Sequence, residues 1–402
     1  MSQNTFADSI RMTAKTLPGL EEVLAEELTA LGAQDVQPQR LAVIFRGSQE
    51  LLYRANLCLR TALRVLVPLR EFHADKTQQI YDAAYSFPWE TYIGPDDSLA
   101  VDTAVSSHTF THGDYCALKV KDAVCDRFTQ KSGRRPSVDT ETPALRINLW
   151  IHDEDCVLSL DSSGDSLHRR GYRLEKTEAP LSEVLAAGIL RLSGWDASLP
   201  LHDPMCGSGT FLTEAGLMAA RIPPGALRKK FGFMGWKTYS PELWKKVRDA
   251  EFSLRRDFPA PITGADSDPK AVEIARSNIR RAGLEGAVSL ERAVFEDASP
   301  PPQGPGIIVM NPPYGKRMKD PRGRWDSQDS RRREDADAPA ADEIGELYTR
   351  IGDTFKRKYT GWTAWMFSAN LEAIKRIGLR PFRRGPLKNG PLECRLLGFK
   401  LF

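Results

Sequence analysis

The sequence lacks an uninterrupted apolar run long enough to cross a membrane, which takes about 20 residues. Its most apolar window, residues 51–69, is interrupted by three arginines. It also lacks the charged start and apolar core that a secretory signal would place within residues 1–20. We therefore expect a cytoplasmic protein with no membrane partner.

Metal ligands are scarce as well. The six cysteines are scattered through 402 residues, and no two of them form a Cys-x-x-Cys pair. This pattern is typical of reduced cytoplasmic thiols and argues against a zinc site. His108 and His112 stand four residues apart, but the intervening Thr-Phe-Thr favours helix poorly and no acidic third ligand accompanies them. We expect no metal.

A strong excess of charge is also absent, since 56 Lys and Arg balance 53 Asp and Glu to a net charge of +3. This balance leaves nucleic acid open as a partner, because binding depends on clusters of basic residues on one face. The length of 402 residues exceeds one ordinary core and predicts two or three domains.

Hydrophobic periodicity divides the chain near residues 165–180. Before this point, strands and amphipathic helices alternate in two units, with strands at 12–15, 41–45, 65–69, 144–151 and 155–160 and helices at 19–31, 48–63 and 119–130. After it, short apolar strands alternate with helices, which predicts a parallel sheet covered on both faces, with strands at 199–202, 262–265, 288–290, 307–310 and 363–367. The charged segment 319–343 is either a solvated insertion or a lid that contacts RNA.

The first motif that carries chemistry is the loop Asp203-Pro-Met-Cys-Gly-Ser-Gly-Thr210, which joins a strand to a helix. Its glycines allow close backbone approach to a ligand, and the helix N-terminus offers free N–H groups. We expect cofactor contacts from Asp203, Pro204, Cys206, Gly207, Ser208, Gly209 and Thr210. Cys206 has no histidine partner in the motif, which favours a packing role over a nucleophilic one.

Two later strands are followed by further carboxylates. Asp266, at a strand end beside Ser267, suits two hydrogen bonds from ribose hydroxyls, whereas Asp268 suits the cap of a helix starting at Pro269. Asp297 could accept from an adenine amino group or simply belong to a turn.

The most specific motif is Asn311-Pro-Pro-Tyr314, directly after the apolar strand 307–310. An exocyclic amine is a poor nucleophile because its lone pair is delocalised into the ring. The side-chain oxygen of Asn311 and the carbonyl of Pro312 could accept its two N–H groups and favour a tetrahedral nitrogen. Tyr314 offers a face on which the target base can stack. The motif thus predicts methylation of a base amino group.

The four motifs, in this order, resemble the amino-methyltransferases that carry an Asn/Asp-Pro-Pro-Tyr motif. Almost end to end, the sequence resembles the THUMP-domain RNA methyltransferases, and most closely the bacterial 23S rRNA guanine-N2 enzymes. Beyond the motifs, the resemblance rests on residues 119–124, 135–139, 158–164, 166–173, 179–184, 231–236 and 388–394. Some relatives carry a second, fused methyltransferase domain that this sequence does not contain.

The resemblance implies an α/β fold with three parts: a ferredoxin-like domain at 1–75, a THUMP RNA-binding domain at 76–165, and a Rossmann-like methyltransferase domain at 175–402. It also implies S-adenosylmethionine as cofactor and places Pro180 in the lead-in to its pocket. We expect no obligate protein partner. Seven basic residues could track RNA phosphates: Lys119, Lys121, Arg134, Arg135, Arg169, Arg170 and Arg173.

Other substrates and one other class of function remain open from the sequence. The substrate could be a guanine in tRNA, or the N6 amine of adenine in DNA, although the THUMP-like half favours RNA. Alternatively, the chain could be an RNA-binding assembly factor of the ribosome with an inactive methyltransferase fold. The intact motifs argue against that alternative.

Overall fold

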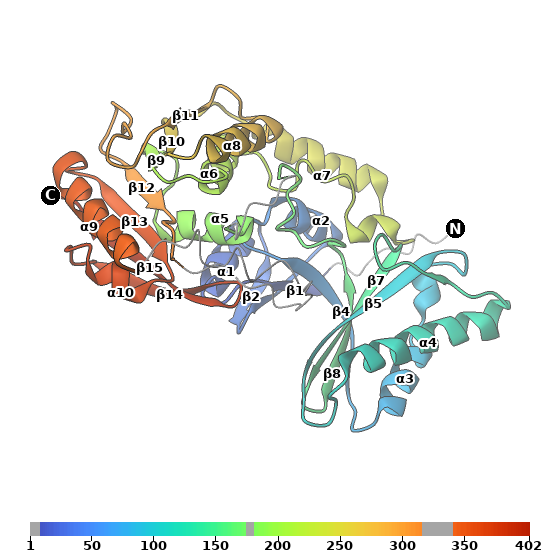
Figure 1. The fold of residues 1–402 in the computed structure, drawn as a ribbon. Coiled ribbons are helices and arrows are strands. Elements are labelled where there is room, and N and C mark those ends of the chain that lie inside the picture. Colours follow the sequence, from blue (N-terminus) through green and yellow to red (C-terminus); the bar gives the residue numbers. More distant parts are fainter. Residues whose placement is uncertain (1–8, 174–180, 316–340) are drawn as a thin grey trace. The chain divides into compact units, whose positions relative to one another are not determined.

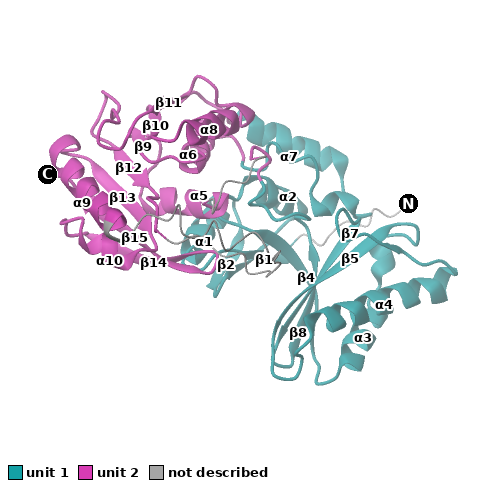
Figure 2. Cartoon of the chain, viewed as in Figure 1, with its two compact units in different colours: residues 1–169, 224–253 teal, residues 170–223, 254–402 magenta. Residues whose placement is uncertain are grey.

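The computed structural model describes residues 9–173, 181–315 and 341–402, which fall into two compact units (Figures 1 and 2). Their segments are 1–169 with 224–253 for unit 1, and 170–223 with 254–402 for unit 2. No helix among the described residues is both long and apolar enough to cross a membrane.

Unit 1 is built on one eight-stranded sheet. Across the sheet its strands follow the order β2 (Gln34–Gln39), β3 (Ala42–Gly47), β1 (Ile10–Lys15), β4 (Arg64–His73), β8 (Asp155–Asp161), β7 (Leu145–His152), β5 (Ser98–Ser106) and β6 (Ser137–Val138). Its α-helices are α1 (Glu21–Ala30), α2 (Gln49–Cys58), α3 (Thr77–Ser86), α4 (Gly113–Ser132) and α7 (Pro241–Ser253), with 3-10 turns η1 (Trp89–Thr91) and η2 (Gly232–Gly235).

Local sequence explains where two of these helices begin and end. The backbone of Ser48 is extended, its hydroxyl accepts the N–H of Leu51, and α2 follows. This helix ends at Cys58, earlier than the expected residue 63, because Leu59 takes an extended ψ of 122°. Helix α4 is longer than expected and ends where Gly133 adopts a left-handed φ of 67°.

The segment 224–253 belongs to unit 1, whereas the sequence assigned it to the methyltransferase domain. Aromatic packing explains this placement, because the Tyr53 ring of α2 stacks on Phe233 at 4.3 Å and meets the edge of Trp244 at 6.1 Å. The guanidinium of Arg228 also donates to four backbone carbonyls between residues 163 and 169. The chain therefore leaves unit 2 after α6 and returns to it before β10.

Unit 2 contains a seven-stranded sheet with the order β11 (Val288–Arg292), β10 (Ile262–Asp266), β9 (Leu201–Asp203), β12 (Ile307–Met310), β13 (Thr363–Ser368), β15 (Leu392–Lys400) and β14 (Arg383–Asn389). The first five are parallel, and β15 is antiparallel to both neighbours. The helices of this unit are α5 (Glu183–Leu192), α6 (Thr210–Ala219), α8 (Pro269–Arg281), α9 (Ala341–Lys358) and α10 (Leu371–Lys375). Most of the charged segment 319–343 lies outside the described residues.

Candidate functional site

The strand order of unit 2 defines where a ligand can bind. The chain runs from β9 outward through β10 to β11, and then returns to the opposite side of β9 as β12. The loops that follow β9 and β12 therefore leave the sheet in opposite directions. In open α/β sheets, ligands bind at the carboxyl ends of the strands beside such a reversal. Both main sequence motifs follow these two strands.

The loop between β9 and α6 holds the two glycines of the first motif. Gly209 has a φ of 73°, and a Cβ there would lie 2.9 Å from the Cβ of Ala275 on α8. Gly207 has a φ of 50°, and open space surrounds the position that its Cβ would occupy. The Cys206 N–H donates to the Ala265 carbonyl at 2.9 Å and fastens the loop to β10. Bare backbone at Gly207 thus fits close approach of a cofactor.

Asp266, the last residue of β10, accepts two backbone hydrogen bonds. Its Oδ2 accepts the N–H of Gly207 at 2.8 Å, and its Oδ1 accepts the N–H of Asp268 at 3.0 Å. Asp268 caps α8 as expected, because its own carboxylate accepts the N–H of Lys270 at 2.9 Å. Ser267 is exposed between the two aspartates. Asp266 is therefore the carboxylate that adjoins the glycine loop.

Two other motif residues differ in burial. Asp203 ends β9 with 1% exposure, and burial raises its pKa well above the usual value, with the nearby Asp266 adding to the effect. Asp297 is exposed in the turn after β11. Burial also raises the pKa of the Cys206 thiol well above its usual value. The thiol is therefore protonated at neutral pH, which suits a packing role.

Arg173, which the sequence predicted to track RNA phosphates, makes its side-chain bonds to the glycine loop and to α5 in this structure. Its guanidinium donates to the hydroxyl of Thr210 at 2.5 Å and to the carbonyl of Leu181 at 3.1 Å. Its Nε lies 3.3 Å from the carboxylate of Glu183 at the start of α5. These bonds hold the first residue of α6 in place. Pro180 lies outside the described residues.

Arg170 is also not a surface cation, contrary to expectation. It is 2% exposed, and its Nε lies 3.4 Å from the carboxylate of Glu214, which also accepts the hydroxyl of Tyr172 at 3.1 Å. A buried arginine needs such a partner, because an unpaired charge is costly inside a protein. Two of the three arginines in the segment 169–173, Arg170 and Arg173, therefore form bonds with residues of α6 inside the protein.

The other five basic residues proposed to bind RNA belong to unit 1 and are Lys119, Lys121, Arg134, Arg135 and Arg169. Arg134, Arg169 and Lys121 each lie beside an aspartate, at 2.7, 3.6 and 2.6 Å. Lys119 lies 5.4 Å from the centre of the Tyr115 ring. Surface ion pairs of this kind contribute little to stability, so these side chains can exchange their partners for phosphates.

The second motif follows β12. Asn311 is half-buried, Pro312 is buried and Tyr314 is half-buried. The hydroxyl of Tyr314 donates to the side-chain oxygen of Asn311, which is one of the two acceptors expected for the target amine. Among the described residues, no donor contacts the carbonyl of Pro312. One acceptor is therefore open, and the other is held by the neighbouring tyrosine.

Residues that sequence reasoning missed support this turn. The Asn370 side chain donates to the Tyr314 carbonyl at 3.2 Å, and the Tyr348 hydroxyl lies 3.5 Å from the Pro313 carbonyl. Burial raises the pKa of the Tyr314 phenol, and the neighbouring Cys394 of β15 adds to this effect. Tyr314 therefore stays neutral. In the sequence, Cys394 drew notice only as the last residue of the segment 388–394, which was noted for its resemblance.

Possible metal ligands are dispersed in the described parts of the chain. There, no three or more His, Cys, Asp or Glu side chains form a group that could hold a metal ion. His108 lies in a loop, and His112 is the residue before α4, so the two do not share a helical face.

Comparison with known protein families accounts for three successive parts of the chain. Residues 11–66 match the RlmL ferredoxin-like domain, 74–161 the THUMP domain and 170–326 the RMKL-like methyltransferase domain. A Synechocystis sp. protein named as an RNA methyltransferase is 40% identical over 385 residues, covering 96% of this chain and 95% of that protein. The chain belongs to the THUMP-domain RNA methyltransferase family. The expected α/β fold with ferredoxin-like, THUMP and methyltransferase parts is confirmed.

Two other relatives are named ribosomal RNA large subunit methyltransferase K/L. The protein of Syntrophotalea carbinolica is 41% identical over 98% of this chain and 54% of its own length. The protein of Methylococcus capsulatus is 41% identical over 95% of this chain and 50% of its own length. The chain thus spans about half the length of these relatives.

Solved structures share the fold over nearly the whole chain. SMU.472, described as a methyltransferase complexed with SAH, is 27% identical with a TM-score of 0.84 and covers 99% of both chains. A Listeria monocytogenes protein, named a predicted N6-adenine-specific DNA methylase, is 27% identical with a TM-score of 0.83 and covers 100% of both chains.

Proposed function

We propose that this enzyme transfers a methyl group from S-adenosylmethionine to the exocyclic N2 amine of a guanine in 23S rRNA. The proposal is supported chiefly by the position of Asn311-Pro-Pro-Tyr314 after β12, next to the strand that leads into the glycine loop. Family membership and the large-subunit rRNA relatives favour RNA over DNA. A ribosomal substrate would place the enzyme in the cytoplasm.

The glycine loop and the carboxylates beside it suit the cofactor. The open backbone at Gly207 can lie against it, and Asp266 is positioned to accept ribose hydroxyls. Asp203, the last residue of β9, and the exposed Asp297, which comes after β11, remain candidates for hydrogen bonds from its amino groups. S-adenosylmethionine supplies an electrophilic methyl group on a sulfonium.

The second motif would act on the amine. Asn311 and the Pro312 carbonyl would accept the two N–H groups and make the nitrogen lone pair available. A new N–C bond then forms as the S–C bond breaks, the sulfur keeps the electron pair, and a proton leaves the nitrogen afterwards. No strong base is required, because the nitrogen becomes acidic only once it carries the methyl group.

Mass spectrometry of nucleosides tests this proposal. Large-subunit RNA from cells that lack the gene would be incubated with the full chain and S-adenosylmethionine, then digested. We expect N2-methylguanosine with the wild-type chain and very little with Asn311→Ala. Methylation confined to tRNA would contradict the proposed substrate and indicate a tRNA enzyme. Formation of N6-methyladenine in DNA would indicate a DNA enzyme instead. A chain that binds RNA but methylates none of these substrates would support the assembly-factor alternative.

A further inference from the structure

One face of the unit 1 sheet contains a depression with a volume of about 670 Å³. Strands β1, β3, β4, β7 and β8 and the turn between β2 and β3 contribute its lining. On β1, Met12 and Ala14 point into the core, so the alternate residues Arg11, Thr13 and Lys15 line the opposite face. The depression is thus a property of the sheet surface of unit 1, and all of its lining residues belong to that unit.

Two cations of this depression, Lys15 and Arg40, have no counter-charge among the residues that the structure describes. Among the described residues, neither Lys15 nor Arg40 has a hydrogen-bond or ion-pair partner through its side chain. Lys15 is half-buried, and this burial lowers the pKa of its ammonium group. Arg11 differs, because it pairs with Glu71. A phosphate placed between Lys15 and Arg40 would supply the missing negative charge.

The same surface offers flat and apolar groups. Trp150 and Phe72 are partly exposed, and the Trp150 ring stacks on His152 with centroids 5.7 Å apart and planes at 20°. Thr13 and Asn148 add hydrogen-bonding groups beside them. Asp155 at the margin contributes one negative charge, so the lining as a whole combines three cations with two acids. Aromatic faces beside unpaired cations are the usual means of binding unpaired nucleotides.

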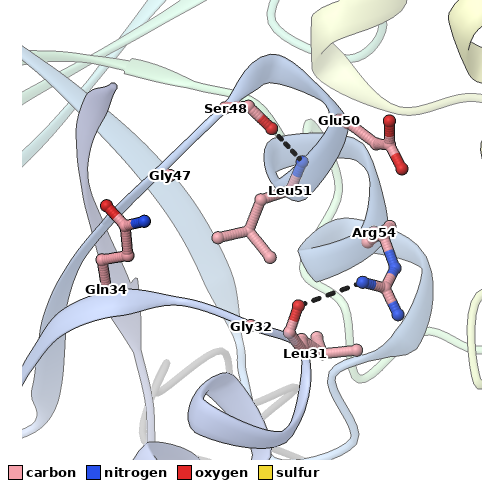
Figure 3. Close-up of a pocket in the computed structure, with 8 residues that line it drawn as sticks. All are labelled: Leu31, Gly32, Gln34, Gly47, Ser48, Glu50, Leu51 and Arg54. Atoms are coloured by element: carbon pink, nitrogen blue, oxygen red, sulfur yellow. Dashed lines mark hydrogen bonds between the residues drawn. The ribbon is translucent and has the colours of Figure 1, made fainter. Parts of the chain in front are cut away.

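A smaller depression of about 270 Å³ in the same unit provides a contrast (Figure 3). Two of its polar side chains are already bonded within the protein: the hydroxyl of Ser48 accepts the Leu51 N–H, and Arg54 donates to the Leu31 carbonyl. It contains no aromatic side chain. This hollow is therefore the space between two helix ends, whereas in the larger depression Lys15 and Arg40 have no side-chain partner among the described residues.

We propose that the sheet-face depression binds a single-stranded segment of the RNA substrate, with one base stacked on Trp150 and phosphates held by Lys15 and Arg40. This proposal rests on the proposed function in taking RNA as the substrate. The depression would be a second RNA-contact region in addition to the cations of helix α4. The volume of the depression falls within the range of roughly 300–1,000 Å³ typical of ligand sites. A duplex cannot use this surface well, because its bases are already stacked.

Binding of a fluorescent eight-nucleotide RNA to the full chain, measured by anisotropy, tests the proposal. Stacking contributes about 1–3 kcal/mol per base, so Trp150→Ala should weaken binding about tenfold or more, whereas Trp150→Phe should weaken it only a few-fold. The Lys15→Ala/Arg40→Ala double variant should weaken binding and reduce the slope of log Kd against log salt by about 1.4, as for two phosphates on a single strand. Lys245→Ala, an exposed cation on α7, is the matched control.

Three outcomes would overturn the proposal: unchanged affinity in both Trp150→Ala and the double variant, equal binding of a duplex of the same sequence, or burial of this face in a dimer that excludes RNA. Thermal unfolding of each variant checks the fold. In the wild-type chain, ultraviolet crosslinks from a 4-thiouridine oligonucleotide should map to β1, β4 or β7. Crosslinks found only in unit 2 would also contradict the proposed binding site.

The proposed function is tested separately through methyl transfer. The Asn311→Ala chain should keep wild-type affinity for the oligonucleotide while losing transfer. If the wild-type chain methylates no RNA yet binds the oligonucleotide through Trp150, the function fails and the binding site stands. If transfer proceeds and Trp150 has no effect on binding, the binding site fails alone.

Discussion

The N–H of Gly207 donates to the Oδ2 of Asp266 at 2.8 Å, which joins the loop after β9 to the end of β10. Asp266 thereby holds the loop in shape before any ligand arrives. A second oxygen of the same carboxylate accepts the N–H of Asp268, so the carboxylate orientation is fixed. A residue proposed to bind ribose is thus also part of the scaffold of the site.

Asp266→Ala should weaken S-adenosylmethionine binding by about 1–3 kcal/mol, because hydrogen-bonding groups on the ligand and on Gly207 lose their partner. Isothermal titration calorimetry measures this loss directly. Asp268→Ala is the control: it removes the α8 cap at a cost of about 1 kcal/mol in stability, with cofactor affinity nearly unchanged. Wild-type affinity in Asp266→Ala together with weak binding in Asp268→Ala would reverse the two assignments.

Arg173→Ala should weaken cofactor binding and leave RNA binding nearly intact. The reason is its bond to Thr210, the first residue of α6, together with its ion pair to Glu183. The matched variant is Arg169→Ala, whose exposed side chain should affect RNA affinity and its salt dependence instead. Calorimetry with cofactor and anisotropy with rRNA fragments separate the two effects. Loss of RNA affinity alone in Arg173→Ala would restore the original assignment from the sequence.

The sequence predicted the strands around the site well, because short apolar runs between glycine and proline mark buried parallel strands. It missed β2, whose residues Gln34–Gln39 are mostly polar and exposed, so no alternation is visible. It also missed β14, where Arg383–Asn389 pairs with β15 along an edge rich in basic residues. Edge strands obtain their stability from backbone pairing, which leaves little hydrophobic pattern.

For the site, the sequence is informative where a structural role depends on the residue's own strand or turn. Asp268 is such a case, because a helix cap depends on neighbours two residues away. It failed for Arg170, since an arginine in a basic segment looks like a surface charge until its distant partner Glu214 is known. Support of Tyr314 by Asn370 depends on the return of the chain through β13. Such long-range contacts leave no local signal.

His202 should make the protein less stable at mildly acidic pH. Burial, with a contribution from Lys358, lowers the pKa of His202 from 6.5 to about 4. The unfolded chain therefore binds the proton more tightly, so stability is complete above about pH 6.5 and is lost as the pH falls toward 4. Between pH 7 and pH 5, the wild-type chain should lose about 2 kcal/mol more than His202→Gln in denaturant unfolding. Equal losses would show that His202 titrates normally.

Asn311 and Tyr314 allow the chemistry of transfer to be separated from binding. The target amine is inaccessible in paired RNA, so the base must be turned out into the site, where Tyr314 would stack on it. Asn311→Ala should leave cofactor affinity nearly intact, because its proposed contacts are to the base. Its single-turnover rate should fall by a factor on the order of 10²–10³, as for loss of one positioned transition-state hydrogen bond.

Variants of Tyr314 test what the hydroxyl of this residue contributes to methyl transfer. This hydroxyl donates to the Asn311 oxygen and so competes with the target amine for one of the two lone pairs of that oxygen. Tyr314→Phe keeps the ring and removes the competing donor, so its single-turnover rate should stay within a few-fold of the wild-type rate. Tyr314→Ala should lose both RNA affinity and rate, because stacking contributes about 1–3 kcal/mol. A severe loss of rate in Tyr314→Phe would mean that the hydroxyl orients Asn311 during transfer, and the bond seen here would then belong to the reactive state.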